Sequence, residues 1–140
     1  MHDRLKLIVV SQEQKLTDTS ADTVTAMTTE GEITILPGHI PLFTRLKEGV
    51  LRYSLSGTEH SIVVSPGFLT IDPSGEITVM VDSGILARDI SEQRAQEAIT
   101  AAKTTLQTAT DRRELLMAEA SLRLAMLELQ IARKARKSPI

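Results

Sequence analysis

The chain has 140 residues, of which 41% are hydrophobic, 24% charged and 2% aromatic, and its formal net charge is −2. This slightly acidic, aromatic-poor composition excludes a general binder of nucleic acid or of anionic membranes. The lack of cysteine excludes disulfides and thiolate metal sites. The apolar run near the N-terminus covers only about five residues, too few for a signal peptide or a membrane span, so we expect a soluble protein.

Glycine and proline divide the chain into two parts. All seven glycines lie at or before Gly84, whereas residues 85–137 contain neither glycine nor proline. Because these residues punctuate turns, their distribution predicts a turn-rich β domain over residues 1–87 and a helical domain over residues 88–140.

Seven short runs in the first part have the composition or alternation of strands, and Pro-Gly and Ser-Gly turn signals separate several of them. The runs are LKLIVV, DTVTAM, GEITIL, GVLRYSLSG, HSIVV, GFLTID and EITVMV. Short strands at a spacing of about ten residues are typical of an antiparallel β-sandwich or flattened barrel. With so few aromatic residues, its core must consist of Val, Ile, Leu and Ala.

The second part predicts two helices, at about residues 91–106 and from Asp111 to about Lys137. The first helix has two candidate N-caps, Asp89 with Glu92 three residues later, or Ser91. The second helix has Asp111, again three residues before a glutamate. The predicted fold class is therefore α+β, an antiparallel sandwich followed by a two-helix hairpin.

The second predicted helix carries two adjacent apolar stripes. One contains Leu115, Ala118, Leu122, Ala125, Leu129 and Ala132, and the other contains Leu116, Ala120, Leu124, Leu127 and Ile131. The alanine-rich first helix can cover one stripe closely. The other stripe must pack on the sandwich or on another protein.

No residue pattern predicts an active site. The three histidines lie far apart without metal-ligand spacing, and neither a GxSxG motif nor a P-loop occurs. Four carboxylates fall near the first predicted hairpin, and they form either an acid/base site or a solvated turn. They are Asp18, Asp22, Glu30 and Glu32.

Several ordered motifs resemble one known family. EGEITILPGHIPL, residues 30–42, is similar to EGELGILPGHAPL in the epsilon subunit of bacterial F-type ATP synthases, and GVLR follows at the same spacing. SPGFLTID is similar to SGGFLEVQP, and ITVMVDSGILARDIS to VTVLADTAERAEDID. The segment ISEQRA is similar to the family's IDxxRA. The resemblance covers nearly the whole chain.

This resemblance implies a rotor subunit with no catalytic, cofactor or metal site of its own. It implies a sandwich that binds the gamma subunit and the c-subunit ring and couples ion-driven ring rotation to ATP synthesis. Any contact with the membrane would go through the c ring, at the cytoplasmic face of the cell membrane. The hairpin would either stay compact or extend along gamma to the alpha and beta subunits and inhibit ATP hydrolysis.

The resemblance also implies roles for particular residues. Glu30 and Glu32 would lie beside the corner formed by Pro37, Gly38 and His39, and together they would contact the c ring. His39 has an alternative role, holding the corner by bonding backbone carbonyls. The regulatory residues of the hairpin would be Ile90, Arg94, Ala95, Arg123, Arg133, Lys134, Arg136 and Lys137.

The four basic residues at the end of the second helix have a second interpretation, since cations are also favoured at a helix C-terminus. ATP binding is expected to be weak or absent, because Ser91 replaces the family's aspartate. Three positions that carry arginine in ATP-binding relatives are here Ala101, Leu124 and Glu128. A triphosphate needs such cations.

Two other functions fit the same sequence features. A sandwich bearing a hairpin is suited to a free adaptor of another oligomeric complex, and co-purification with gamma and the c ring would separate that function from a rotor subunit. A small hydrolase with a carboxylate or histidine site near residues 30–40 would need a pocket and measurable turnover.

Overall fold

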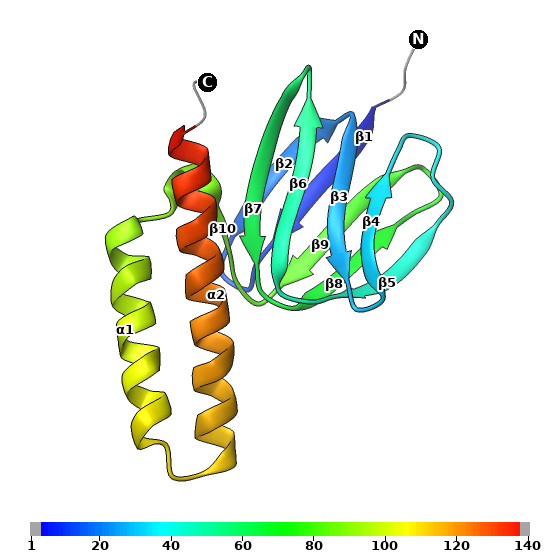
Figure 1. Cartoon of the computed structure of the whole chain (residues 1–140). Helices are drawn as coiled ribbons and strands as arrows, with labels where there is room; N and C mark the ends of the chain where they lie inside the picture. The colour runs from blue at the N-terminus through cyan, green and yellow to red at the C-terminus, as the bar shows by residue number, and fades with distance from the viewer. Residues whose placement is uncertain (1–3, 138–140) are drawn as a thin grey trace. The chain divides into compact units, whose positions relative to one another are not determined.

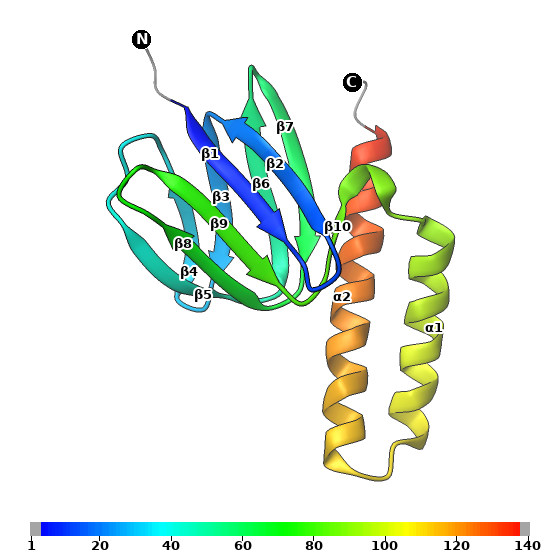
Figure 2. The same cartoon turned by 180° about the vertical axis from the view of Figure 1, so that it is seen from behind.

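The computed structural model describes residues 4–137 and contains ten strands, a short 3-10 turn and two α-helices (Figures 1 and 2). Its contacts cluster into two units, one ending at Leu86 and the other beginning at Ala87. The first unit contains all the strands and the second contains the helices.

The strands form one sheet that folds over on itself. They are β1 (Leu5–Val10), β2 (Lys15–Ala21), β3 (Thr23–Thr28), β4 (Gly31–Ile35), β5 (Leu42–Leu46), β6 (Gly49–Leu55), β7 (Thr58–Val64), β8 (Gly67–Ile71), β9 (Glu76–Val81) and β10 (Gly84–Leu86). The order is β10-β7-β6-β3-β5-β8-β9-β1-β2, with β4 paired to β3. In Figures 1 and 2, β7, β6, β3 and β4 form one layer, and β5, β8, β9, β1 and β2 form the other. The predicted fold class is confirmed.

One strand pair and three strands differ from the prediction. β1 and β9 pair in parallel, with Leu7 opposite Ile77, whereas the other recorded pairs are antiparallel. Residue patterns did not predict β2, β5 or β10. β2 has the polar sequence KLTDTSA, of which only Ala21 is buried, and β10 has only three residues. Neither shows the apolar alternation by which strands are recognised.

Alternation along the strands builds the sandwich core. In β1, Leu5, Leu7 and Val9 are buried while the residues between them are more exposed. The largest fully buried side chains of the sandwich are Leu7, Ile35, Leu51, Ile62, Leu69 and Ile77. Burying one such side chain stabilises the fold by about 1.5–3 kcal/mol. Tyr53 is the one aromatic residue that packs partly against this core.

The second unit contains a 3-10 turn (Ala87–Asp89), α1 (Glu92–Thr108) and α2 (Arg112–Lys137). Ser91 caps α1, because the Arg94 amide donates to Ser91 Oγ at 3.2 Å. The alternative cap Asp89 is wrong, since that residue lies in the 3-10 turn. Asp111 caps α2 as predicted and accepts from the Glu114 amide at 2.7 Å.

Small side chains fill the interface between the two helices. Ala95 and Ile99 of α1 form a buried cluster with Ala125 and Leu129 of α2. Alanine lets two helix backbones approach closely. Of the two stripes of α2, α1 covers the first, which contains Ala125 and Leu129. In the second stripe, Leu116 is 51% exposed.

Candidate interaction surface

An exposed apolar patch occupies the outer surface of β5, β8 and β9. We call it the aromatic face and define it as Phe43, Arg45, Phe68 and Met80. Strand register brings these residues together, because Phe68 lies opposite Arg45 on one side and opposite Met80 on the other. The Phe43 and Phe68 rings stack with centroids 5.6 Å apart, and the Arg45 guanidinium carbon lies 6.0 Å from the Phe68 centroid.

The alternation of the strands places these side chains outside. Leu69 and Val79 point into the core, so their neighbours Phe68 and Met80 point to the other side of the sheet. Phe43 is 65% exposed, Phe68 40% and Met80 43%. Both phenylalanines of the chain therefore lie on the surface of the sandwich rather than in its core. Contiguous exposed apolar side chains of this kind mark sites of protein–protein contact.

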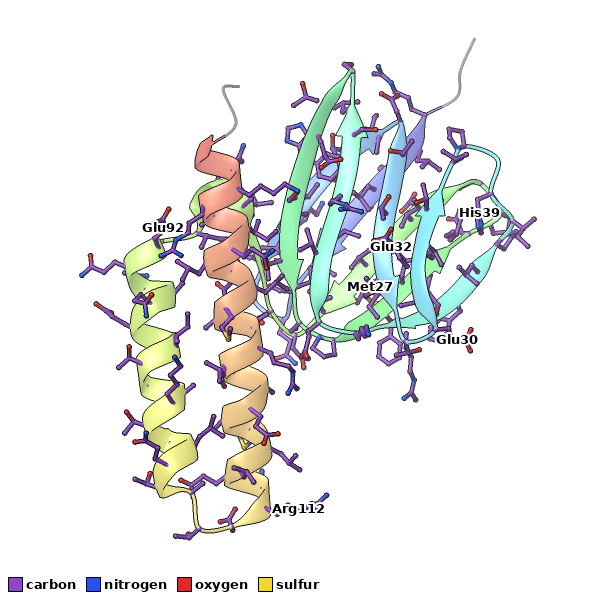
Figure 3. All side chains as sticks on the ribbon, viewed as in Figure 1. Met27, Glu30, Glu32, His39, Glu92 and Arg112 are labelled. Carbon is purple, nitrogen blue, oxygen red and sulfur yellow. The ribbon has the colours of Figure 1, made fainter. Side chains whose placement is uncertain are left out.

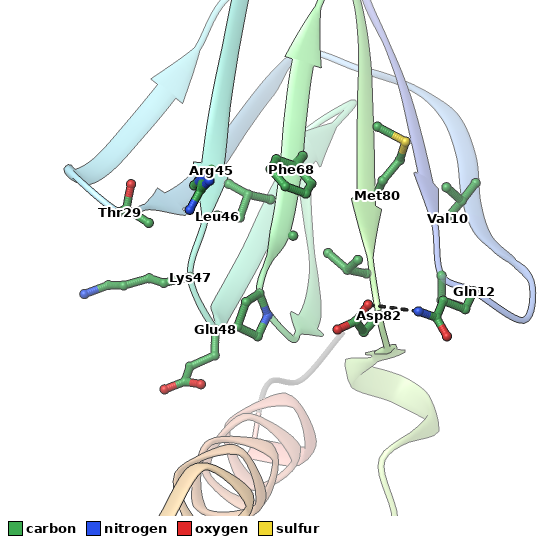
Figure 4. A pocket seen from close by; sticks show the side chains of 14 residues that line it. Val10, Gln12, Thr29, Arg45, Leu46, Lys47, Glu48, Phe68, Met80 and Asp82 are labelled. Atoms are coloured by element: carbon green, nitrogen blue, oxygen red, sulfur yellow. Dashed lines mark hydrogen bonds between the residues drawn. The ribbon is translucent and has the colours of Figure 1, made fainter. Parts of the chain in front are cut away.

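A groove of ≈ 670 Å³ adjoins the aromatic face (Figure 4). Phe68, Met80 and Val81 contribute apolar surface to it, and turns at the ends of the strands form its rim. On the rim, Gln12 Nε2 donates to Asp82 Oδ1 at 3.1 Å. Apolar walls with polar groups at the edge suit a side chain of a partner protein.

The corner after β4 is held by its own backbone and by His39. Gly38 has φ +88°, a left-handed conformation that favours glycine. The His39 amide donates to the Leu36 carbonyl at 3.1 Å, and His39 Nδ1 lies 2.7 Å from the Ile40 carbonyl oxygen. Because a carbonyl only accepts, Nδ1 must carry the proton. The alternative role of His39, bonding a backbone carbonyl, is therefore observed.

The acidic tip before β4 lies away from this corner. Glu30 immediately precedes β4, whereas Pro37, Gly38 and His39 come after Leu36 beyond its other end. Glu30 and His39 thus lie at opposite ends of a strand of five residues (Figure 3). Such a strand spans about 16 Å. The expectation that the tip lies beside the corner is therefore wrong. Glu32 is the second residue of β4, and its carboxylate pairs with Arg52 of β6 at 3.3 Å.

The other carboxylates near the first hairpin also have separate partners. Asp18 pairs with Lys15 at 3.1 Å, and Asp22 pairs with Arg4 at 3.0 Å. Asp22 Oδ2 also accepts from the Ser56 amide at 2.8 Å. Within residues 4–137, no group of three or more His, Cys, Asp or Glu residues could hold a metal ion. Asp18, Asp22 and Glu32 thus each pair with a different cation.

The residues implied for the hairpin lie on both helices and, in the case of Ile90, just before α1. Ile90 and Ala95 are buried, whereas Arg94, Arg123, Arg133 and Lys134 are exposed. The side chains of Arg136 and Lys137 lie outside the described residues.

Burial raises the pKa of the Glu128 carboxyl on α2. In the described part of the chain, no helix is long and apolar enough to cross a membrane.

Residue patterns did not predict the aromatic face. GFLTID contains the one usable signal, since Phe68 and Leu69 are apolar neighbours that must point to opposite sides of a strand. Phe43 could not be placed because β5 was not identified.

Comparison with known proteins identifies the family. The model of the ATP synthase delta/epsilon chain beta-sandwich domain matches residues 4–87. The ATP synthase epsilon chain of Chromobacterium violaceum is 42% identical over 129 residues, which cover 91% of each chain. This chain belongs to the ATP synthase epsilon-chain family. The epsilon chain of Dehalococcoides mccartyi strain BAV1 is 39% identical over 137 residues, or 97% of each chain. Epsilon chains are non-catalytic stalk subunits of ATP synthase.

Solved structures have the same fold. A chain of the Euglena gracilis mitochondrial ATP synthase OSCP/F1/c-ring structure matches with a TM-score of 0.73 and 21% identity, covering 96% of this chain and 82% of that one. A chain of the Tetrahymena thermophila mitochondrial ATP synthase central stalk/c-ring structure matches with a TM-score of 0.62 and 11% identity, covering 94% and 98%.

Proposed function

We propose that this chain couples ion-driven rotation of a c-subunit ring to ATP synthesis, as the epsilon subunit of an F-type ATP synthase central stalk. The observation that carries the proposal is the 42% identity to an epsilon chain over 91% of the sequence. The complex would place the chain at the cytoplasmic face of the cell membrane, in contact with the membrane only through the ring. The test is whether the chain co-purifies with gamma and the c ring from native membranes.

The aromatic face is the proposed docking surface for the gamma subunit. A rotor subunit must bind its stalk neighbour firmly enough to turn with it, and exposed aromatic side chains at the centre of an interface carry much of the binding energy. Arg45 beside Phe68 adds a cation that an acidic group on gamma would complement.

This docking can be tested with purified gamma. Phe43→Ser removes the most exposed ring of the aromatic face and should weaken binding by at least about tenfold, the scale of a hot-spot side chain. Thr34→Ala, an exposed position on β4, is the matched control and should leave the affinity unchanged. Equal affinity of the Phe43 variant and the control would assign gamma binding to another surface.

Glu30 and Glu32 at the acidic tip are proposed to contact polar loops of the c subunits. The Pro37, Gly38 and His39 corner is proposed as a second contact, and its position at the other end of β4 lets the two be tested separately. Glu32→Gln and His39→Ala should each weaken binding to isolated c ring. The control is Glu59→Gln, an exposed acid on β7. Unchanged affinity in either variant would remove that residue from the interface.

The hairpin is proposed to inhibit ATP hydrolysis by extending toward the alpha and beta subunits. Its second apolar stripe and the basic residues Arg133 and Lys134 would then meet the catalytic head, with Arg136 and Lys137 continuing the basic run. Deleting residues 88–140 should raise the hydrolysis rate of the reassembled complex if the deleted chain still assembles. A rate equal to that of the full complex would leave the hairpin without an inhibitory role.

ATP is not proposed as a ligand of the hairpin. Ala101 and Leu124 offer no cation, and the Glu128 side chain would repel a triphosphate when ionised. Titration calorimetry of the isolated chain should therefore detect no tight binding. A micromolar dissociation constant would contradict this expectation.

A further inference from the structure

The hairpin is packed unevenly along its length. Its buried cluster is formed by Ala95, Ile99, Ala125 and Leu129, which lie toward the end of the hairpin away from the loop. From Lys103 to Met117, through the loop, each residue is exposed or half-buried. We call residues 103–117 the loop end. Local stability follows buried apolar contact, so the loop end should be the weaker half.

Threonines weaken the same half of α1. The hydroxyls of Thr100, Thr104, Thr105 and Thr108 each donate to the carbonyl four residues earlier, at 3.1–3.2 Å. Threonine is a poor helix former, and this type of bond offers the backbone carbonyl a competitor to the helical amide. The first half of α1, EQRAQEAI, consists mostly of strong helix formers.

The helix ends at the loop add to this weakness. The last turn of α1, residues 105–108, contains no cation to balance the helix dipole, and Ala109 ends the helix in an extended conformation (φ −61°, ψ 130°). Arg112 and Arg113 place two positive charges in the first turn of α2, where the dipole disfavours them (Figure 3). Asp111 and Glu114 offset part of that effect.

We propose that the hairpin opens from its loop end, which unfolds locally while the cluster around Ile99 and Leu129 stays closed. The threonines of α1 set how often this opening occurs. The opening would separate the start of α2, which carries the exposed side chains of Leu115, Leu116 and Met117, from the end of α1. The use of this opening as the first step of hairpin extension rests on the proposed function, whereas the opening itself is a property of the isolated chain.

Hydrogen exchange of the intact isolated chain, resolved by residue with NMR, tests the proposal. Hydrogen-bonded amides of residues 104–108 and 116–117 should exchange at least about tenfold faster than those of residues 96–102 and 118–132, after correction for intrinsic rates. Comparable protection along both helices would overturn the proposal, because the hairpin would then open as one unit.

A triple substitution tests the role of the threonines. Thr100, Thr104 and Thr108 are exposed, so T100A/T104A/T108A leaves the helix interface unchanged. Each alanine should favour the helix by roughly threefold, and exchange at residues 104–108 should slow by about tenfold or more. The control T100S/T104S/T108S keeps the hydroxyls and should change exchange by less than about threefold.

Two results would reject the role of threonine. One is unchanged exchange in the alanine variant. The other is an equal slowing in the serine control, which would show that the hydroxyl has no part in it. Failure of the hairpin to inhibit hydrolysis in the assembled complex would contradict the proposed function but would leave these exchange results unaffected.

Discussion

The sandwich and the hairpin differ in what they bury. The sandwich core is built mainly from Leu, Ile and Val side chains contributed by strands far apart in the sequence, such as Leu7, Leu51 and Ile77. The hairpin cluster contains two alanines beside Ile99 and Leu129. Larger buried area stabilises the sandwich, whereas small side chains let two helices approach with little apolar surface removed from water.

This difference matches the two tasks proposed for the chain. A sandwich with a continuous core is a rigid support on which an exposed aromatic face can keep its geometry during rotation. A hairpin with a small core can separate at moderate cost in free energy, as a switching element requires. The two regions should therefore respond differently to substitution, acid and heat.

The largest effect is expected at Gly67, where β8 approaches β9 too closely for a side chain. A Cβ atom at this position would collide with the Met80 carbonyl oxygen and come within 2.9 Å of Val81 Cα. Gly67→Ala should lower the free energy of unfolding of the sandwich by about 3–4 kcal/mol. Tyr53 is the only tyrosine, and the chain has no tryptophan. The fluorescence of Tyr53 therefore reports denaturant unfolding of the sandwich.

Thr70→Ala on the outer side of the same strand is the control for this substitution, with an expected loss below about 1 kcal/mol. A similarly small loss for Gly67→Ala would mean that β8 and β9 can move apart without disturbing the core.

A somewhat smaller effect is expected from Leu129→Ala in the hairpin. Removing this buried side chain should cost about 2–3 kcal/mol. Because the helices form a separate unit, helical circular dichroism should melt at lower temperature while the Tyr53 transition stays in place. Leu7→Ala in the sandwich should give the opposite pattern. A shift of both signals by Leu129→Ala would show that the two units unfold together.

A cap substitution should have an effect of about 1 kcal/mol on the hairpin. Ser91→Ala removes the hydroxyl that accepts from the Arg94 amide at the start of α1. The matched control is Ser121→Ala, at an exposed interior position of α2, where alanine should be neutral or stabilising. Helical circular dichroism on heating distinguishes the two variants. Equal melting of the Ser91 variant and wild type would assign the cap to another group.

The sequence predicted those parts of the fold whose side chains alternate or recur locally. β1, with its alternate buried positions, and the capped start of α2 depend on neighbours within a few residues. β2 was missed because its sequence is polar on both sides. α1 extends to Thr108, slightly beyond its predicted end near residue 106, although threonine is a poor helix former.

The candidate interaction surface was predictable only in part. The Pro-Gly corner is a local feature and was recognised. The stacking of Phe43 on Phe68 depends on the register of two strands that are separated by other elements, which residue patterns do not give. The acidic tip was wrongly expected beside the corner, because the motif alone does not show that the whole length of β4 separates the two.

The smallest predicted effects concern how acid pH changes the stability of each region, and they have opposite signs in the sandwich and the hairpin. In the sandwich, hydrogen bonds from the Ser74 hydroxyl and then from the Glu76 amide lower the pKa of Asp72 from 3.8. Stability from this group is present above pH 3.8 and is lost as the pH falls through the lower pKa of the folded state. Asp72→Asn should therefore make the Tyr53 transition less sensitive to pH below about 4.

In the hairpin, burial raises the pKa of Glu128 from 4.5. A carboxyl with a raised pKa favours the folded state when protonated, so its contribution is present below pH 4.5 and is lost as the pH rises through the higher pKa of the folded state. Glu128→Gln should raise the melting temperature of the helices at neutral pH and reduce its dependence on pH, whereas Glu119→Gln on the same helix is the control. If wild-type helices melted at the same temperature at about pH 4 and about pH 7, the burial of Glu128 would have no energetic consequence.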